Sequence, residues 1–475
     1  MSHSPAKNNS LGDGLSDRQI GMISIAGIIG AGLFVGSANA IATAGPAVLL
    51  SYAMTGVLVL LVMRMLGEMA VLQPDTGSFS TYAAKAIGPW AGFTIGWLYW
   101  WFWVLLIPVE AIAGADILHA YFPSIAAWQF TTAIILLLTV TNLFSVKNFG
   151  AFEFWFAIIK VVAIIGFIGI GLMAIFGHWP LANVSGVAHL YNNIGFMPHG
   201  FGAVLTGILL TIFSFFGAEV VTIAAVESKD PGKKISRAIN LVVYRIALFY
   251  LLSIFLVVSL ISWNDPELLK QGTFQYVLST LNFPGAKLVV DVVVLIAVCS
   301  CMNSGLYTAS RMLYSLGKRG NAPASCATVT RGSVPRVAVL GSTLAGFVAC
   351  IANYAFPGEV FAFLISTTGA IALIVYLVIA VSQLRMRSAL EKRGITPDFK
   401  MWFFPWLTWL SILMILSVLG YMFYLPQYRY ESLMTMGVTL LVLCAGIYVT
   451  GKRKKQEAIF STARISKEKI QVARH

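Results

Sequence analysis

Ionisable side chains lie inside apolar stretches at three places in the chain. Lys160, Glu110 and Glu219 each interrupt a run of apolar residues that is long enough to cross a membrane. An ionisable group in such a run is functional by default and needs a partner. Burial disfavours the charged form of a lysine, so a buried lysine can release and take up a proton. These residues therefore favour proton exchange or the binding of a small charged molecule.

Two of the apolar stretches also contain residues that interrupt a helix. Residues 24–34 include three glycines, and each glycine costs about 1 kcal/mol relative to alanine inside a helix. Residues 213–219 place Gly217 close to Glu219. Unwound backbone in lipid is tolerated only where it is buried in protein or lines a cavity, and broken helices mark the binding sites of transporters. The alternative is close helix–helix contact through small residues.

A broken helix offers two kinds of bare peptide group. One half-helix presents N–H groups with partial positive charge, and the other presents carbonyl groups. A carboxylate suits the first and an ammonium group suits the second, so two breaks side by side form a receptor for a zwitterion. The residues of the breaks that we expect to line this receptor are Ala26, Gly27, Ile28, Gly30, Ala31, Gly32, Phe213, Ser214, Phe216 and Gly217.

The composition identifies a protein that crosses a membrane many times. Of the 475 residues, 58% are hydrophobic and 11% are charged, and apolar runs of transmembrane length recur along the chain. No cleavable signal peptide is expected, because residues 1–18 are polar and the apolar run after them is too long. We predict twelve helices, at residues 20–42, 47–71, 90–118, 126–144, 152–176, 201–227, 239–262, 286–313, 337–354, 359–384, 403–424 and 431–450.

Basic residues concentrate in every second loop. The N-terminus, alternate loops and the C-terminal tail hold 26 of the 32 Lys and Arg residues, which predicts that both termini lie in the cytoplasm. The net charge of +13 then belongs to a membrane surface and not to a nucleic-acid partner. The predicted organisation is a cytoplasmic segment (residues 1–19), a transporter domain (residues 20–450) and a basic cytoplasmic tail (residues 451–475) that contacts anionic lipid.

The two interrupted segments are the first and the sixth. Because they are five apart, they enter the membrane from opposite sides, as two inverted repeats of five helices require. The repeats are predicted at about residues 20–176 and 201–384, and two further helices are appended at about residues 403–450. The predicted fold is therefore an all-α membrane bundle of twelve helices in which helices 1 and 6 are broken.

The eighth segment carries a face of small and polar residues. Cys301 and Ser304 lie on this face with Ser300 and Asn303 beside it, and we expect it to face the first and fifth helices. Tight packing through small side chains is the alternative. Aromatic residues near the breaks are predicted to wall or close the site, namely Tyr99, Trp100, Trp103, Phe213 and Phe216.

The acidic residues inside the spans have different expected roles. Glu110 has three open roles, which are to bind a substrate ammonium group, to carry a proton or to pair with another helix. Glu219 is expected to hydrogen-bond the freed backbone of the break and not to touch substrate. Glu68 and Arg64 are four residues apart on one helical face, which predicts an ion pair. Glu153 lies near the cytoplasmic end of the fifth segment.

Short stretches spread over about residues 11–450 share their sequence with one family of membrane proteins. They are residues 27–34 (GIIGAGLF), 65–69 (MLGEM), 75–79 (DTGSF), 96–100 (GWLYW), 149–156 (FGAFEFWF), 217–225 (GAEVVTIAA), 303–315 (NSGLYTASRMLYS) and 376–387 (YLVIAVSQLRMR). Through them the chain resembles the bacterial amino acid transporter branch of the amino acid–polyamine–organocation superfamily, and within it the 4-aminobutyrate (GABA) permeases.

The resemblance implies a proton-driven importer in the bacterial inner membrane with the leucine-transporter-like inverted repeat. Its implied partners are a small zwitterionic amino acid, a proton and the lipid bilayer. The implied substrate is GABA or a similar ω-amino acid, with α-amino acids as the alternative. In proton-coupled relatives a lysine at the position of Lys160 replaces a sodium ion and touches the first and eighth helices. Lys160 is therefore the predicted proton carrier, and a permanent structural cation that holds carbonyl groups is the alternative.

Two positions depart from the family pattern. Ala31 stands where many relatives have threonine, and Thr222 stands where α-amino acid carriers often have glycine. On this basis Thr222 is predicted to narrow the substrate site beside the sixth-helix break. Glu110 is the second candidate for proton coupling.

Other function classes lack their signatures. The six histidines show neither metal-ligand nor catalytic-triad spacing, and the five cysteines form no Cys-x-x-Cys pair. No Gly-x-x-x-x-Gly-Lys-Ser/Thr motif indicates an ATP-driven pump, and no pore repeat indicates a channel. The sequence therefore predicts no enzyme, no catalytic residue, no metal and no cofactor besides the coupled proton.

Overall fold

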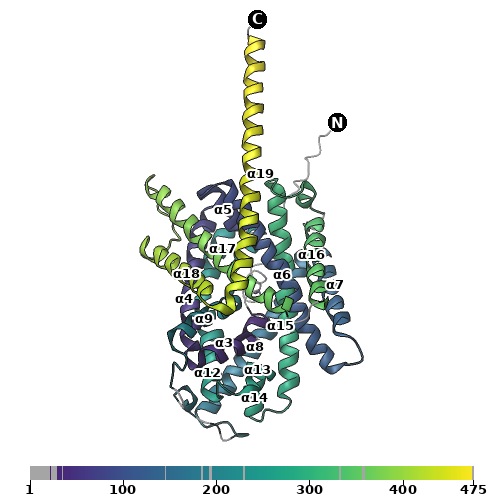
Figure 1. Ribbon diagram of the computed structural model, residues 1–475, viewed down its shortest axis with the longest axis vertical. Coiled ribbons are helices and arrows are strands. Elements are labelled where there is room, and N and C mark those ends of the chain that lie inside the picture. Colours follow the sequence, from purple (N-terminus) through teal and green to yellow (C-terminus); the bar gives the residue numbers. More distant parts are fainter. Residues whose placement is uncertain are drawn as a thin grey trace.

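The computed structural model is an elongated bundle of helices (Figure 1). It describes residues 22, 29–34, 36–144, 146–182, 184, 186–191, 195–227, 230–330, 333–355 and 359–472. Within these ranges every regular element is a helix. The prediction of an all-helical chain is confirmed.

The elements follow one another without a strand in the described ranges. The helices are α2 (Ala31–Phe34), α3 (Gly36–Ala44), α4 (Val48–Leu72), α5 (Ser78–Ala86), α6 (Pro89–Tyr121), α7 (Ala127–Phe144), α8 (Val146–Ile175), α9 (Gly200–Phe215), α10 (Val220–Ala224), α11 (Pro231–Arg245), α12 (Ser253–Leu260), α13 (Pro266–Gln271), α14 (Thr273–Thr280), α15 (Ala286–Lys318), α16 (Arg336–Ala355), α17 (Glu359–Glu391), α18 (Trp406–Tyr424) and α19 (Pro426–Val472). Short 3-10 turns are η1 (Gly45–Ala47), η2 (Ala188–Leu190), η3 (Ala225–Glu227) and η5 (Ala324–Ala327), and η4 (Ile246–Leu252) is a π-helical segment.

Helix starts follow the local chemistry of the sequence. Pro89 occupies the first turn of α6, where its missing N–H group is no loss. Gly88 precedes it with a φ of 154°, a backbone angle that other residues rarely adopt. Asp265 caps α13, because its Oδ1 accepts the backbone N–H of Glu267 at 2.9 Å. Such turns and caps separate the long apolar helices.

Ten helices in the described part of the chain are long and apolar enough to cross a membrane. The stretch Gly32–Leu72 contains the described part of the first predicted segment together with the second, joined through η1. The ninth predicted segment corresponds to α16, whose apolar part Arg336–Ala352 is shorter than a full span. The total of twelve spans stays a prediction, since residues 23–28 lie outside the described ranges.

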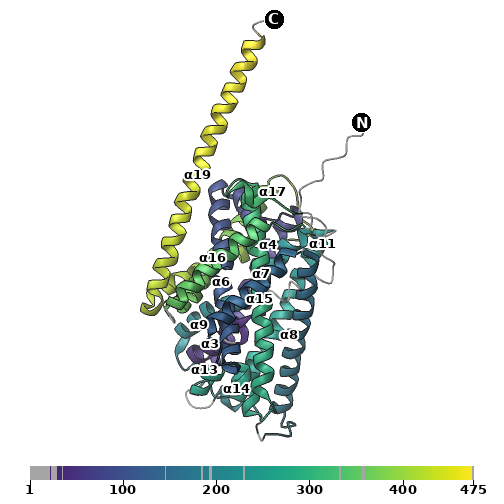
Figure 2. The same ribbon diagram turned by 90° about the vertical axis from the view of Figure 1, so that its right-hand side faces the viewer.

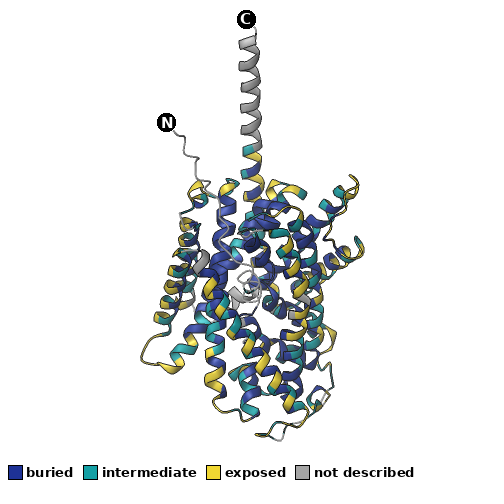
Figure 3. Ribbon diagram, turned by 180° about the vertical axis from the view of Figure 1, so that it is seen from behind, coloured by how far each residue is buried: buried dark blue, intermediate teal, exposed yellow. Residues whose placement is uncertain are grey.

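The centre of the bundle is formed by α6 and α15, which pack along each other. Each has 33 residues, and α8 lies beside α15 (Figure 2). Buried residues fill the interior of the bundle, while exposed residues lie around its sides and loops (Figure 3). An apolar outer surface around a buried centre is expected of a protein surrounded by lipid.

The last helix, α19, continues well past the end of its apolar part. It projects from the bundle as a single rod (Figure 1), although the sequence predicted that the helix ends near residue 450. After Gly451 the chain has no glycine or proline before residue 472, so nothing stops the helix. Nη1 of Arg453 donates to the carbonyl of Arg319 at 2.8 Å and to Oδ1 of Asn321 at 3.2 Å, which fixes α19 to the end of α15.

Candidate functional site

The helix of residues 200–224 is interrupted at its middle. α9 ends at Phe215, residues 216–219 form turns, and α10 begins at Val220. Phe216 has extended backbone angles (φ −68°, ψ 139°) and Gly217 has a φ of 111°, which favours glycine. The interruption frees peptide groups in a stretch whose side chains are almost entirely buried.

Two side chains hold two of these freed peptide groups, one from η4 and one from the interruption itself. The hydroxyl of Tyr250, within the π-helical segment η4, donates to the carbonyl of Ser214 at 2.7 Å. The carboxylate of Glu219 accepts the N–H of Gly217 at 3.1–3.2 Å, and its Oε1 also accepts the hydroxyl of Tyr99 at 3.0 Å. Buried peptide groups must be satisfied in this way. The bare N–H group of Gly217 is therefore occupied by the protein's own carboxylate.

Within the described residues, the chain bends at Ile29 and Gly30, immediately before α2. Lys160 of α8 donates from Nζ to the carbonyl of Ile29 at 2.9 Å. This carbonyl is one that a continuous helix would use internally. Ala26, Gly27 and Ile28 lie outside the described residues.

The bent start of α2 lies directly against the interrupted helix. A methyl group on Gly32 would come within 2.8 Å of the backbone Cα of Ser214 and 3.1 Å of the ring of Phe213. A methyl group on Gly30 would come within 2.8 Å of Sγ of Cys301 and 3.1 Å of Oε1 of Glu110. The two glycines therefore allow an approach that any larger residue prevents.

A small cavity of about 10 Å³ lies between these helices. This volume holds about one water molecule, so the walls exclude an amino acid in this conformation. The lining includes seven of the predicted residues, namely Gly30, Gly32, Glu110, Phe213, Ser214, Phe216 and Cys301, together with the predicted wall residue Trp103. Phe102 and Leu106 also line it and had no distinguishing signal in the sequence.

Aromatic side chains close the cavity on the side toward Glu219. The ring of Phe216 lies 4.1 Å from that of Phe102 and 5.4 Å from that of Tyr376, measured between centroids. Tyr99 lies 5.9 Å from Phe216 in the same group. We call Tyr99, Phe102, Trp103, Phe216 and Tyr376 the aromatic cluster.

A second polar group lies beside the cavity between α8 and α15. Lys160 and Glu153 are both fully buried. Nζ of Lys160 donates to Oγ of Ser300 at 2.9 Å, and this hydroxyl donates to Oε2 of Glu153 at 2.8 Å. Nδ2 of Asn303 donates to Oε1 of the same carboxylate at 2.7 Å, and Ser304 is buried one turn beyond Ser300. The ammonium group of Lys160 and the carboxylate of Glu153 are thus connected by hydrogen bonds through the hydroxyl group of Ser300 on α15.

Two predicted residues lie away from the cavity. Oγ1 of Thr222 forms hydrogen bonds with the hydroxyl of Ser78 and the carbonyl of Glu219, and Thr222 does not line this cavity, so its role in narrowing the substrate site stays a prediction. Nε1 of Trp100 donates to Oγ of Ser342 on α16, so Trp100 does not wall the cavity. Ala31 lies in α2, and its side chain is outside the described part.

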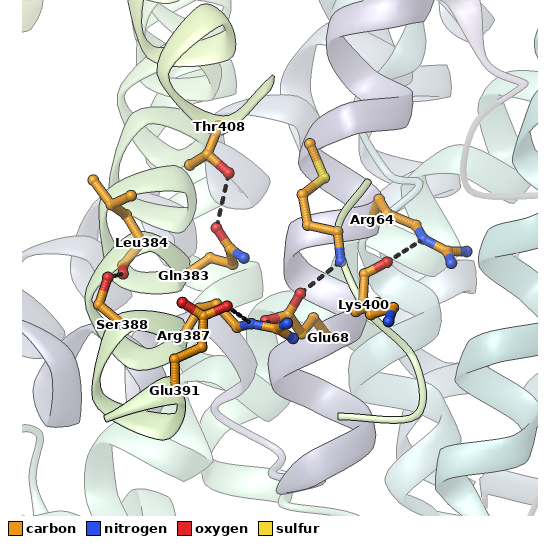
Figure 4. A network of polar contacts seen from close by, with 10 residues as sticks. Arg64, Glu68, Gln383, Leu384, Arg387, Ser388, Glu391, Lys400 and Thr408 are labelled. Atoms are coloured by element: carbon orange, nitrogen blue, oxygen red, sulfur yellow. Dashed lines mark hydrogen bonds and ion pairs between the residues drawn. The ribbon is translucent and has the colours of Figure 1, made fainter. Parts of the chain in front are cut away.

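The expected ion pair between Arg64 and Glu68 is wrong. Glu68 instead lies 3.6 Å from Nη1 of Arg387 on α17 and accepts the backbone N–H of Met401 at 2.6 Å (Figure 4). Arg64 turns away and donates from Nε to the carbonyl of Lys400 at 2.9 Å. Both side chains are therefore used to hold the segment before α18, a contact between distant parts of the chain that helical spacing does not reveal.

Comparison with known proteins gives consistent results. Residues 19–462 match the family model described as "Amino acid permease". The chain is 57% identical over 449 residues to the "Probable GABA permease" of Pseudomonas aeruginosa, with 94% of each chain covered. It is 57% identical over 436 residues to the "Gamma-aminobutyric acid permease" of Escherichia coli, which covers 92% of this chain and 94% of that one.

A solved structure has a similar fold. The manganese transporter of Eremococcus coleocola aligns with a TM-score of 0.58 at 13% identity, over 96% of this chain and 100% of that one. At this identity the likeness concerns the fold alone. The family match and the identity to the two relatives extend over nearly the whole chain. The chain therefore belongs to the amino acid permease family, a family of membrane transporters and not of enzymes.

Proposed function

We propose that this protein is a proton-coupled importer of GABA and related ω-amino acids that works by alternating access. The observation that carries the proposal is the cavity between two bent or interrupted helices, lined by glycine backbone and by Glu110. The names of the two relatives support GABA as the substrate. Broken helices that meet near the middle of a membrane bundle are the usual substrate site of such transporters.

The substrate carboxylate would bind at the N–H groups around Gly30 and Gly32. These groups begin α2, where the first N–H groups of a helix have no partner within it and carry partial positive charge. At the other break the N–H of Gly217 is already held by Glu219, so the first helix is the better carboxylate site. The substrate ammonium would face Glu110, whose carboxylate lines the same cavity.

Binding requires the cavity to open, because its volume is about 10 Å³. The aromatic cluster is the part that would move, since Phe216 belongs to the interruption and contacts Phe102 and Tyr376. The hydrogen bond between Tyr99 and Glu219 lies behind it and would break or reform with the same motion. The proposed gate therefore consists of the rings of the aromatic cluster, which would move apart, and the hydrogen bond between Tyr99 and Glu219, which would break.

Proton coupling would act through Lys160. Its charged form donates to the carbonyl of Ile29 and so supports the bend of the first helix. Loss of the proton would weaken this contact and release the first helix, which carries the substrate carboxylate site. Transport would thus be linked to the proton gradient, and one charge that crosses 100 mV supplies about 2.3 kcal/mol.

The proposed architecture is the inverted repeat of residues 20–176 and 201–384 with twelve spans and both termini in the cytoplasm. The interruption of the helix at residues 216–219 and the bend at Ile29 support it. The concentration of Lys and Arg in alternate loops supports the orientation.

Uptake into proteoliposomes under an imposed pH gradient tests the proposal. We expect accumulation of labelled GABA when the outside is acid, competition by β-alanine, and loss of accumulation when an uncoupler is added. Empty liposomes are the control. Accumulation of an α-amino acid without that of GABA would overturn the substrate, and flux that only equilibrates GABA would overturn the coupling.

A further inference from the structure

An open groove of about 570 Å³ lies on the outer side of the bundle, away from the cavity described above. Its walls are the first four turns of α11, the end of α4 and the segment that precedes α18. α4 and α11 lie side by side near the end from which α19 projects (Figure 2). This is the end that carries the basic loops of the chain.

The groove has a basic part. Lys233 and Arg237 are exposed and line it, and their spacing of four residues places them on one face of α11. Ser236 and Asn240 add hydrogen-bonding groups. One acidic residue, Asp398, lines the opposite wall, so the balance of charged side chains in the groove is positive.

A second, smaller hollow of about 210 Å³ continues from the groove. It shares Asn240 and Tyr244 with the groove and is otherwise lined mainly by apolar and aromatic side chains such as Leu60 and Trp402. Arg64 forms the boundary between the two, because its Nη1 donates to Oδ1 of Asn240 at 2.8 Å. The combined hollow is therefore basic at one end and apolar at the other.

Exposed apolar and aromatic side chains around this hollow favour a position at the boundary between headgroups and hydrocarbon. Leu241 is 41% exposed and Tyr244 is 71% exposed, and α11 begins the stretch Pro231–Leu260, which is apolar enough to span a membrane, so we expect this side of α11 to face lipid. Trp402 and Trp406 are exposed beside it, and exposed tryptophan marks the membrane interface. The basic end thus lies at headgroup level, and the aromatic end lies where acyl chains begin.

Arg64 gives the hollow its fixed shape. Its guanidinium lies 3.9 Å from the ring centroid of Phe399 and 4.6 Å from that of Trp402, and its Nε holds the carbonyl of Lys400 (Figure 4). The segment before α18 is therefore fastened against α4 and α11. A groove with fixed walls loses little entropy when a ligand enters it.

We propose that this hollow binds one anionic phospholipid from the surrounding leaflet. The phosphate would lie between Lys233 and Arg237, the glycerol and ester groups near Asn240, and one acyl chain along Tyr244 and Trp402. Basic pockets at the membrane surface of transport proteins recognise anionic headgroups. A soluble phosphate would leave the apolar hollow unused, and a lipid without net charge would not balance the two cations.

Lipid retention by the purified protein tests the site. The variant Lys233→Ala/Arg237→Ala is compared with Lys392→Ala/Arg393→Ala, which removes two exposed cations that follow α17 and do not line the groove. Each protein is mixed with phosphatidylglycerol or with phosphatidylcholine of the same chains, and native mass spectrometry counts bound lipid. Each cation near an anionic surface contributes about fivefold in affinity, so we expect about a thirtyfold loss for phosphatidylglycerol in the groove variant alone.

Two further experiments distinguish a lipid phosphate from a soluble phosphate and a loss of binding from a loss of folding. Glycerol phosphate at the same concentration should neither bind nor displace the lipid, and equal binding by glycerol phosphate would overturn the lipid proposal. Lys233→Arg/Arg237→Lys keeps the charges and should retain phosphatidylglycerol, which distinguishes lost binding from lost folding. Equal loss in the Lys392/Arg393 control, or equal retention in all variants, would also overturn the site.

Discussion

Lys160 and Glu153 are joined through the hydroxyl group of Ser300. The ammonium group donates to this hydroxyl at 2.9 Å, and the hydroxyl donates to the carboxylate at 2.8 Å. Lys160 and Glu153 are seven residues apart on α8 and therefore lie on one helical face, two turns from each other. Any change in the proton of Lys160 must reorganise a chain of hydrogen bonds that ends on a buried carboxylate. The two charges therefore act as one unit.

Substitution of Lys160 should remove proton coupling. Lys160→Arg keeps a cation near the carbonyl of Ile29 but holds its proton permanently, and Lys160→Ala removes the donor. We expect both variants to lose uptake that is driven by a pH gradient in proteoliposomes. Lys287→Ala, which removes an exposed lysine paired with Asp291 far from the cavity lining, is the control and should transport normally. Normal coupled uptake in both Lys160 variants would remove this residue from the mechanism.

Ser300→Ala should disconnect the cation from the carboxylate. The variant leaves Nζ of Lys160 and Oε2 of Glu153 each without one hydrogen bond in a buried site, which costs about 1–3 kcal/mol. We expect the pH profile of uptake to shift while the protein still folds. Ser411→Ala is the matched control, because this buried serine only donates to a carbonyl of its own helix. An unchanged pH profile for Ser300→Ala would contradict the link.

Gly32→Ala should stop transport through one added methyl group. The new Cβ would come within 2.8 Å of the backbone of Ser214, and backbone yields less easily than a side chain. Overpacking of this kind costs about 1–3 kcal/mol and would force the two helices apart. Gly169→Ala, where no atom lies within 4 Å of the new methyl group, is the control. We expect at least about a tenfold loss of uptake only for Gly32→Ala, and equal activity would show that the close approach is unnecessary.

Arg387→Ala should destabilise the protein far more than loss of a surface pair. Glu68 is 2% exposed in its pair with Arg387, so removal of the arginine strands a buried carboxylate and costs roughly 3 kcal/mol. Lys270→Ala breaks the exposed pair with Glu267 and should cost less than about 1 kcal/mol. Melting curves in detergent compare the two. A similar melting temperature for both variants would mean that the contacts drawn in Figure 4 do not hold the segment before α18.

Asp265 should contribute stability that is lost in acid. The hydroxyl of Tyr276 and the N–H of Glu267 donate to its carboxylate and hold the pKa of Asp265 below its ordinary value of about 3.9. A carboxylate with a lowered pKa stabilises the fold above the ordinary pKa, and this contribution disappears as pH falls through the lowered pKa. The melting temperature of the wild type should therefore approach that of Asp265→Asn below about pH 4. If the difference in melting temperature between the wild type and Asp265→Asn does not change over that pH range, the assignment is wrong.

Glycine and charge patterns predicted the centre of the candidate site. The glycines at residues 30, 32 and 217 disfavour a helical backbone at their own positions, and this local effect can be predicted from the sequence alone. The same holds for Lys160 and Glu110, since an ionisable group in an apolar helix needs a specific surrounding. Most of the cavity lining could therefore be predicted from the amino-acid sequence.

Contacts between segments that are distant in the sequence could not be predicted from such local patterns. Tyr250 reaches the carbonyl of Ser214 only because a π-helical segment turns it inward, and no sequence pattern marks such a segment. Arg64 and Glu68 satisfy the helical rule for an ion pair, but stronger partners approach each from α17 and from the segment before α18. The hydrogen bond between the hydroxyl groups of Thr222 and Ser78 of α5 is another contact between distant segments that the sequence did not indicate.

The hydrogen bonds from Arg453 tie the C-terminal helix α19 to Arg319 and Asn321, just after the end of α15, the helix that carries Ser300 and Cys301. From Arg453 to Val472 this rod extends for about 28 Å at 1.5 Å per residue. A tilt of α15 that is passed to α19 through this contact would therefore become a larger displacement at the far tip. A fluorophore at the end of α19 and a second one on the bundle would therefore report this movement as a change in the distance between them, which energy transfer can measure.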